Sequence, residues 1–100
     1  MVRFEVKELS EIDATLVEFE IVDGVLSVEE GFSIELPEVP FDKGVILSGR
    51  GPIWFYGRLL HAYHPSRWVA VFDPRLGAVV VASHWRGVSE GTVIPREKLR

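Results

Sequence analysis

An α/β fold with a mixed sheet is predicted by three features of the middle of the chain. The first is an apolar run at Val45–Leu47, and the second is a glycine turn leading into a long segment of helical spacing from Pro52. The third is a pair of further apolar runs, Trp68–Phe72 and Ala78–Ala82. Strand, helix and strand in this order are typical of a right-handed parallel crossover. Because the runs are nearly continuous rather than alternating, we expect strands buried on both faces of the sheet.

The N-terminal part, residues 1–42, is expected to extend this sheet or to form a dimer surface. Val2–Lys7 and Thr15–Val22 alternate apolar and charged residues, a period of two that indicates strands with one face in the core. We expect the two strands to form a β-hairpin across Glu8–Ala14.

The next segment is less clearly patterned. Val25–Gly31 fits either a short helix or a poorly formed strand, and the sequence does not decide between them. Phe32, Ile34 and Leu36 alternate again before Pro37 to Pro40 ends the pattern.

The ligand-binding and catalytic core is predicted at residues 43–84, with its polar side chains at two ends. Asp73 to Gly77 has the composition of a tight turn, so the strand that follows it should be antiparallel. The topology then places one group at the carboxyl ends of the parallel strands, which we call the carboxyl rim: Ser48, Gly49, Arg50, Gly51, Asp73 and Arg75. The opposite group, the histidine end, contains His61, His64 and His84. At about 3.3 Å per strand residue the two ends lie roughly 15–20 Å apart, so one subunit is not expected to bring Asp73 and His84 together.

Residues 85–100 are predicted to be peripheral. Trp85–Gly91 has two glycines and is expected to form a loop, and Thr92–Ile94 fits one more short strand. Pro95–Arg100 is a polar tail that we expect to fray.

Length and composition limit the class of protein. One hundred residues with 47% hydrophobic composition make one domain with its own core. There are no cysteines, which excludes disulfides and thiolate metal sites and suits a reducing compartment. No signal peptide or membrane-crossing run is visible, so we expect a cytoplasmic protein.

The net charge of −4 conceals a strong asymmetry along the chain. Residues 1–42 contain twelve acidic and two basic residues, whereas residues 43–86 contain six basic residues and one acid, Asp73. This asymmetry favours an anionic ligand on the C-terminal portion. The alternative for Arg58, Arg67 and Arg86 is that they only solvate the surface.

The turn Ser48–Gly51 is the candidate anion site. Pro52 is expected at the first helical position, Gly51 allows close backbone approach, and Arg50 adds a cation beside the free N–H groups of the helix start. Phosphate is the leading ligand. The turn lacks the lysine of a P-loop and the third glycine of a dinucleotide fingerprint, which disfavours ATP hydrolysis and NAD binding. Turns between strand and helix also need glycine for structural reasons alone.

Histidines and one acid are the candidates for chemistry. His61 and His64 are three residues apart on one helix face, a spacing that suits metal chelation or acid catalysis, although capping or packing would explain His61 equally well. Asp73 is accounted for by its turn, but it also ends a central strand, where ligands of α/β domains usually bind. Arg75 is placed to reach the same phosphate. Four aromatic residues are candidates for base stacking or, more simply, for the core: Trp54, Phe55, Trp68 and Trp85.

Four phrases of the central part resemble a known family. They are SGRGPIW, HAYH, WVAVFDPRLGAVVV and SH. In this order and spacing, Lys43–His84 closely resembles the CRISPR-associated Csx-three family, the small ring nucleases of type III CRISPR systems. Asp73–Val81 is the most specific part, Gly57-Arg58 departs from the pattern, and the N-terminal third matches only in general layout.

The resemblance implies a Rossmann-like fold of the CRISPR-associated type, a homodimer, and a role in antiviral defence. It implies a manganese-dependent phosphodiesterase that binds and cleaves cyclic tetra-adenylate, with exonuclease action on RNA with 3′ adenosines as a related activity. By position in the motifs, Ser48 and Arg50 would hold phosphates and His64, Asp73 and Arg75 would be catalytic. The candidate metal ligands are His64, Asp73 and His84. Manganese takes oxygen and imidazole ligands, which this chain supplies.

The two-ended layout adds an expectation about assembly. If the carboxyl rim and the histidine end are far apart, a complete site needs the rim of one dimer against the histidine end of the next, with the cyclic tetranucleotide between them. Dimers would therefore stack head to tail. Two other readings are a sensor that binds the same ligand without cutting it, and a small structural α/β dimer, which would leave the charge asymmetry unexplained.

Overall fold

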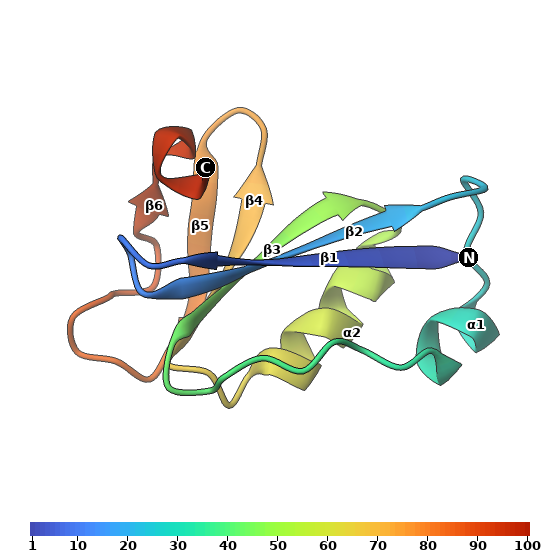
Figure 1. Cartoon of the computed structure of the whole chain (residues 1–100), viewed down its shortest axis with the longest axis horizontal. Coiled ribbons are helices and arrows are strands. Elements are labelled where there is room, and N and C mark those ends of the chain that lie inside the picture. The colour runs from blue at the N-terminus through green and yellow to red at the C-terminus, as the bar shows by residue number, and fades with distance from the viewer.

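The architecture is that of a computed structural model, which describes all residues from 1 to 100. It has six strands, two α-helices and one 3₁₀-helix (Figure 1). In chain order these are β1 (Val2–Leu9), β2 (Ala14–Ile21), α1 (Val28–Ser33), β3 (Gly44–Arg50), α2 (Ile53–Tyr63), β4 (Trp68–Asp73), β5 (Gly77–Ser83), β6 (Val93–Ile94) and the 3₁₀-helix η1 (Arg96–Leu99). The α/β class predicted from the sequence is confirmed.

The strands form one six-stranded mixed sheet in which spatial order follows chain order. β3 and β4 are parallel and β4 and β5 antiparallel, as the apolar runs and the turn at Asp73 predicted. β1 pairs with β2 in antiparallel register, and β6 with β5 likewise. β2 is also parallel to β3, which makes a second crossover that passes through α1 and was not predicted.

The central strands are buried on both faces. Val45, Ile46 and Leu47 of β3 are fully inaccessible. Val45 and Leu47 pack against Phe55 and Leu59 of α2, and both α-helices lie on this side of β1, β2 and β3 (Figure 1). Ile46 points to the opposite face, where apolar side chains from the C-terminal segment cover the second core cluster: Val88, Ile94 and Leu99. The domain thus has helices on one face and irregular C-terminal chain on the other.

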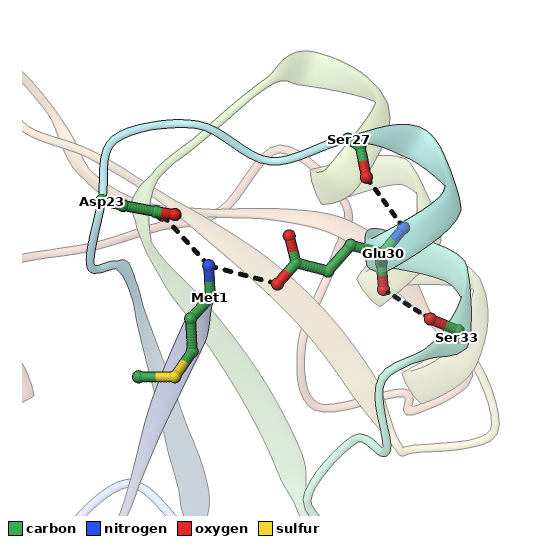
Figure 2. A network of polar contacts seen from close by, with 5 residues as sticks. All are labelled: Met1, Asp23, Ser27, Glu30 and Ser33. Carbon is green, nitrogen blue, oxygen red and sulfur yellow. Dashed lines mark hydrogen bonds and ion pairs between the residues drawn. The ribbon is translucent and has the colours of Figure 1, made fainter.

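The segment left undecided between helix and strand contains the start of α1. Ser27 caps the helix, because its hydroxyl accepts the Glu30 N–H at 3.1 Å (Figure 2). The Glu30 carboxylate lies 3.1 Å from the Met1 amino group, which also donates to Asp23 at 3.0 Å. These contacts hold α1 beside the first residue of the chain.

Three local predictions were wrong. The alternation at Phe32, Ile34 and Leu36 is not a strand, because Phe32 belongs to α1 and an extended linker follows. Pro52 is the N-cap of α2, with extended backbone, and not the first helical residue. The tail does not fray: it forms η1, whose Leu99 packs on the core and whose Lys98 pairs with a β1–β2 turn carboxylate, Glu11, at 2.7 Å.

Candidate functional site

The turn between β3 and α2 carries the candidate anion-binding residues. Arg50 ends β3, is exposed, and forms no ion pair or side-chain hydrogen bond. Pro52 provides no side-chain cap for α2, although its carbonyl accepts the Phe55 N–H of the first turn at 3.0 Å. Along β3, Ser48 and Arg50 alternate with the buried Leu47, so both face away from α2. An unpaired cation therefore lies at the end of β3, on the face of the sheet opposite α2.

The two glycines of this turn have packing reasons of their own. A Cβ on Gly49 would lie 2.4 Å from the Phe19 carbonyl oxygen and 2.7 Å from the Phe19 ring. A Cβ on Gly51 would lie 2.9 Å from the same ring. The Gly49 carbonyl also accepts a hydrogen bond from the Tyr56 hydroxyl, which fixes α2 to the end of β3. Both glycines are thus required for the fold, and a role in ligand approach stays a prediction.

Asp73 and Arg75 form the second part of the carboxyl rim. The Asp73 carboxylate accepts the Arg75 backbone N–H at 2.8 Å, and the Asp73 carbonyl accepts the Leu76 N–H at 3.1 Å, which closes the turn. The Arg75 backbone N–H, followed by its guanidinium, holds the pKa of Asp73 below its ordinary value. The Arg75 side chain is 86% exposed and makes only long contacts, 3.4 and 3.5 Å, to that carboxylate. It is available to an external anion.

The carboxyl rim is divided into two arms. β3 and β4 pair only as far as Leu47 and Val71, and their arrowheads point apart (Figure 1). Beyond that point Arg50 lies beside Glu20 of β2, whereas Asp73 pairs with Gly77 of β5. Asp73 also alternates with Val71 and Val69 onto the α2 side of the sheet, away from the Arg50 side. The two arms share a sheet edge but are not adjacent.

The histidine end brings two of its three members together. His64, the C-cap of α2, and His84, which follows β5, have ring centroids 4.8 Å apart. The His84 N–H donates to the Arg67 carbonyl at 2.7 Å, which fixes the end of β5 to the loop before β4. All three histidines are exposed, and His61 makes no contact with this pair in the structure beyond its carbonyl, which accepts the His64 N–H at 3.4 Å.

The two ends are separate, as the topology predicted. In the β4–β5 register, Asp73 lies opposite Gly77, and Trp68, at the other end of β4, lies opposite Ser83, the residue before His84. Asp73 and His84 are therefore at opposite ends of the same strand pair.

The tentative metal ligands do not form a complete set within one chain. No group of three histidine or carboxylate side chains is close enough to hold an ion. The His64–His84 pair offers two imidazoles, which suits manganese or another divalent ion, but Asp73 is at the far end. Within one chain, any further ligand to an ion at this pair would have to be water, an oxygen of the bound ligand, or a residue outside these three.

Several basic residues of the core have structural partners. Arg58 donates to the Gly31 carbonyl at 2.7 Å and lies over the Phe32 ring, so it caps α1. Lys43 pairs with Glu8, which raises the pKa of Lys43. Arg58 is half-buried and bonded to backbone carbonyls, so it does more than solvate the surface, and the prediction of a positive C-terminal portion now depends mainly on Arg50, Arg75 and Arg86.

Two features near the candidate residues were not identified from the sequence. Arg96 of η1 donates to the Pro74 carbonyl at 3.3 Å, which adds a cation beside the Asp73 turn. At the histidine end, Arg67 lies 3.5 Å from Asp13 and its guanidinium carbon lies 4.1 Å from the centre of the Trp85 ring. Neither contact has a local signal, because each joins segments far apart in the chain.

None of the three surface hollows contains a residue of the carboxyl rim or the histidine end. The largest, of about 550 Å³, lies between β1 and the linker and is lined by Phe4 and residues 35–38. A second, of about 310 Å³, lies over β1 and β2 and is lined partly by Arg3, Glu18 and Glu20. The candidate residues thus lie on open surface in a single chain.

Fold and site define a small α/β domain with unpaired arginine at one end and a histidine pair at the other. Residues 19–95 match the family model described as CRISPR-associated protein (Cas_csx3). The chain therefore belongs to the Cas_csx3 family of CRISPR-associated proteins, which confirms the family predicted from the central motifs.

A relative is similar to this chain over nearly its whole length. An uncharacterized protein of Aquifex aeolicus (strain VF5) is 45% identical over 102 residues, which cover 97% of this chain and 90% of that protein. The match includes the N-terminal third, which the central motifs alone did not reach. Neither helix of the structure has the length and apolar character needed to cross a membrane.

Proposed function

We propose that this protein is a ring nuclease that binds and cleaves cyclic tetra-adenylate, the second messenger of type III CRISPR defence. Family membership supports a CRISPR-associated role. The observation that carries the proposal further is the exposed and unpaired Arg50 at the end of β3, because a free guanidinium suits the phosphates of an anionic ligand.

The proposed active site is shared between molecules. Arg75 and Asp73 of one molecule would meet His64 and His84 of another, because one chain holds the two groups at opposite ends. A homodimer whose dimers stack head to tail would create such contacts on both sides of the ring. A cyclic tetranucleotide also suits two-fold symmetry, since each half of the ring can meet an identical pocket.

Within that site the residues of the chain would have distinct tasks. Arg50 and Arg75 would neutralise phosphate charge, with Ser48 and the N–H groups of the turn as further donors. His64 would move a proton at the scissile phosphate, either from the attacking oxygen or to the leaving oxygen. Asp73, whose pKa is lowered and which is ionised at neutral pH, would orient its partner groups. Manganese, when bound, would polarise the scissile phosphate.

Two finer proposals accompany this one. The β3–α2–β4 crossover supports a relationship to the CRISPR-associated Rossmann-like domains, although both α-helices lie on one side of β1–β3. Linear RNA with 3′ adenosines is a second substrate class, because the same phosphates and bases would reach the same groups.

The test is direct. The protein is incubated with cyclic tetra-adenylate with and without manganese, and His64→Ala and Asp73→Ala are compared with the unmodified chain. We expect metal-dependent linear products that either substitution abolishes. Binding of cyclic tetra-adenylate without cleavage in every condition would favour the second candidate, a sensor that binds the ring without cutting it. The observation in favour of the sensor is that one chain holds no complete set of metal-ligating side chains.

A further inference from the structure

The histidine end carries an ordered aromatic side chain that the proposed mechanism does not use. Trp85 directly follows His84 in the chain and is 47% exposed, whereas Trp68 is 4% exposed. One side of its indole is covered by the Arg67 guanidinium, 4.1 Å from the ring centre. Arg67 is itself positioned by Asp13, 3.5 Å away.

Further contacts fix the backbone at Trp85, and a neighbouring glycine leaves space for one edge of the indole. The Ser83 hydroxyl accepts the Trp85 N–H at 3.1 Å and donates to the Val88 carbonyl at 2.5 Å, which closes the loop around Trp85. A Cβ on Gly87 would lie 3.0 Å from the indole nitrogen, so Gly87 leaves just enough room for the ring edge. The ring is thus held in place while nearly half of the residue stays in contact with solvent.

We propose that Trp85 is a base-stacking platform, a subsite for an adenine or another purine ring of the nucleotide bound at the His64–His84 pair. The inference rests on the proposed function for the identity of the ligand and on the Arg67–Trp85–Gly87 geometry for its place. An exposed, pre-oriented indole binds a base with little loss of conformational freedom. The guanidinium on the other side fixes the plane of the ring and adds positive charge near the phosphates.

The chemistry also favours a purine over a pyrimidine. Every base has a face that can stack, but the larger purine covers more of an indole, while phosphate contacts are the same for both. Trp85 would therefore contribute base preference at an end of the molecule where the histidines contribute none.

The experiment compares labelled linear tetra-adenylate and tetra-uridylate RNA at fixed salt, with binding followed by anisotropy and by tryptophan quenching. Trp85→Ala should bind tetra-adenylate roughly 5- to 150-fold more weakly, the range for loss of one stacked base, and tetra-uridylate should lose less. Trp85→Phe should recover part of the tetra-adenylate affinity while the quenching disappears. The matched control is Phe32→Ala, since Phe32 is 57% exposed and also lies against an arginine, Arg58 at 5.3 Å, but on α1.

Two results would overturn the platform: unchanged tetra-adenylate binding by Trp85→Ala, or equal losses for both RNAs, which would indicate a merely structural tryptophan. Absence of quenching in the unmodified chain at saturating tetra-adenylate would have the same meaning. Failure of the proposed function is distinguishable, because it would appear as quenching by tetra-adenylate without cleavage of the cyclic ring.

Discussion

Mixing two inactive variants tests whether the active site is shared between molecules. The perturbations are His64→Ala, which damages the histidine end, and Asp73→Ala, which damages the carboxyl rim. Both side chains are on the surface or partly exposed, so each variant is expected to fold. Each alone should be inactive on cyclic tetra-adenylate, because every contact between molecules then lacks one partner.

The size of the recovery follows from the geometry. The eleven residues of α2 span about 16 Å at 1.5 Å per residue, so His64 lies far from the rim at the other end of the helix. If sites form only between molecules, an equal mixture offers four pairings of rim and histidine end, of which one has both intact. Activity should therefore return to roughly one quarter of that of the unmodified protein, as expected for random assembly of equivalent subunits.

The assay is cleavage of cyclic tetra-adenylate at constant total protein across a series of mixing ratios. His64→Ala mixed with His84→Ala is the matched control, because the two rings are 4.8 Å apart at one end and should fail together in every mixture. Two results would refute the shared site. One is recovery of cleavage activity in that control. The other is no recovery of activity when His64→Ala and Asp73→Ala are mixed in conditions where the unmodified protein cleaves.

Three further predictions concern stability and ionisation. Gly57→Ala should stabilise the protein by about 1 kcal/mol and raise the Tm by about 4–8 °C in calorimetry, since Gly57 is inside α2 and nothing lies within 4 Å of a Cβ there. Gly49→Ala should instead destabilise the protein by about 1–3 kcal/mol, because its Cβ would lie 2.4 Å from a carbonyl oxygen. A Tm that falls in Gly57→Ala and rises in Gly49→Ala would contradict the packing argument. In an NMR titration of Arg75→Ala, the pKa of Asp73 should stay below its ordinary value, because the larger cause of the lowering is the hydrogen bond from the backbone N–H of residue 75. The stability that this carboxylate contributes is present above its ordinary pKa and is lost as the pH falls through the lowered pKa. A return of the Asp73 pKa to its ordinary value would show that the guanidinium is the larger cause. Burial raises the pKa of Tyr63 to about 12, so the stability from its neutral form is present below its ordinary pKa of 10.0 and is lost as the pH rises toward 12. In an alkaline titration followed by tyrosinate absorbance, one tyrosine should ionise later than the ordinary value, and Tyr63→Phe should remove that step. Ionisation of Tyr63 at the ordinary value would contradict its burial.

Much of the core fold was predictable because its signals are local. The β3–α2–β4–β5 order and the direction of each strand follow from apolar runs and from the turn at Asp73, all within short stretches of sequence. The start of α1 also had a local signal, Ser27 followed three residues later by Glu30, which is the pattern of an N-terminal capping box. The sequence nevertheless leaves Val25–Gly31 undecided between helix and strand, because the segment has too few apolar positions to show a period.

What could not be predicted depends on contacts between distant segments. η1 is held in place because Leu99 packs against a core cluster with residues from β1 to β5, and because Lys98 pairs with Glu11 of the β1–β2 turn. The Arg67–Trp85 contact likewise joins two loops at the histidine end. No periodicity within the tail or the loop reports such partners.

The division of the carboxyl rim changes what ligand the site can fit. Paired strands lie about 4.8 Å apart, but β3 and β4 stop pairing after Leu47 and Val71, and Arg50 and Asp73 then face opposite sides of the sheet. Arg50 thus belongs to one arm of the rim, and Asp73 with the neighbouring Arg75 belongs to the other. We therefore expect a ligand that contacts both arms to carry several phosphates over a larger span, as an oligonucleotide or a nucleotide ring does.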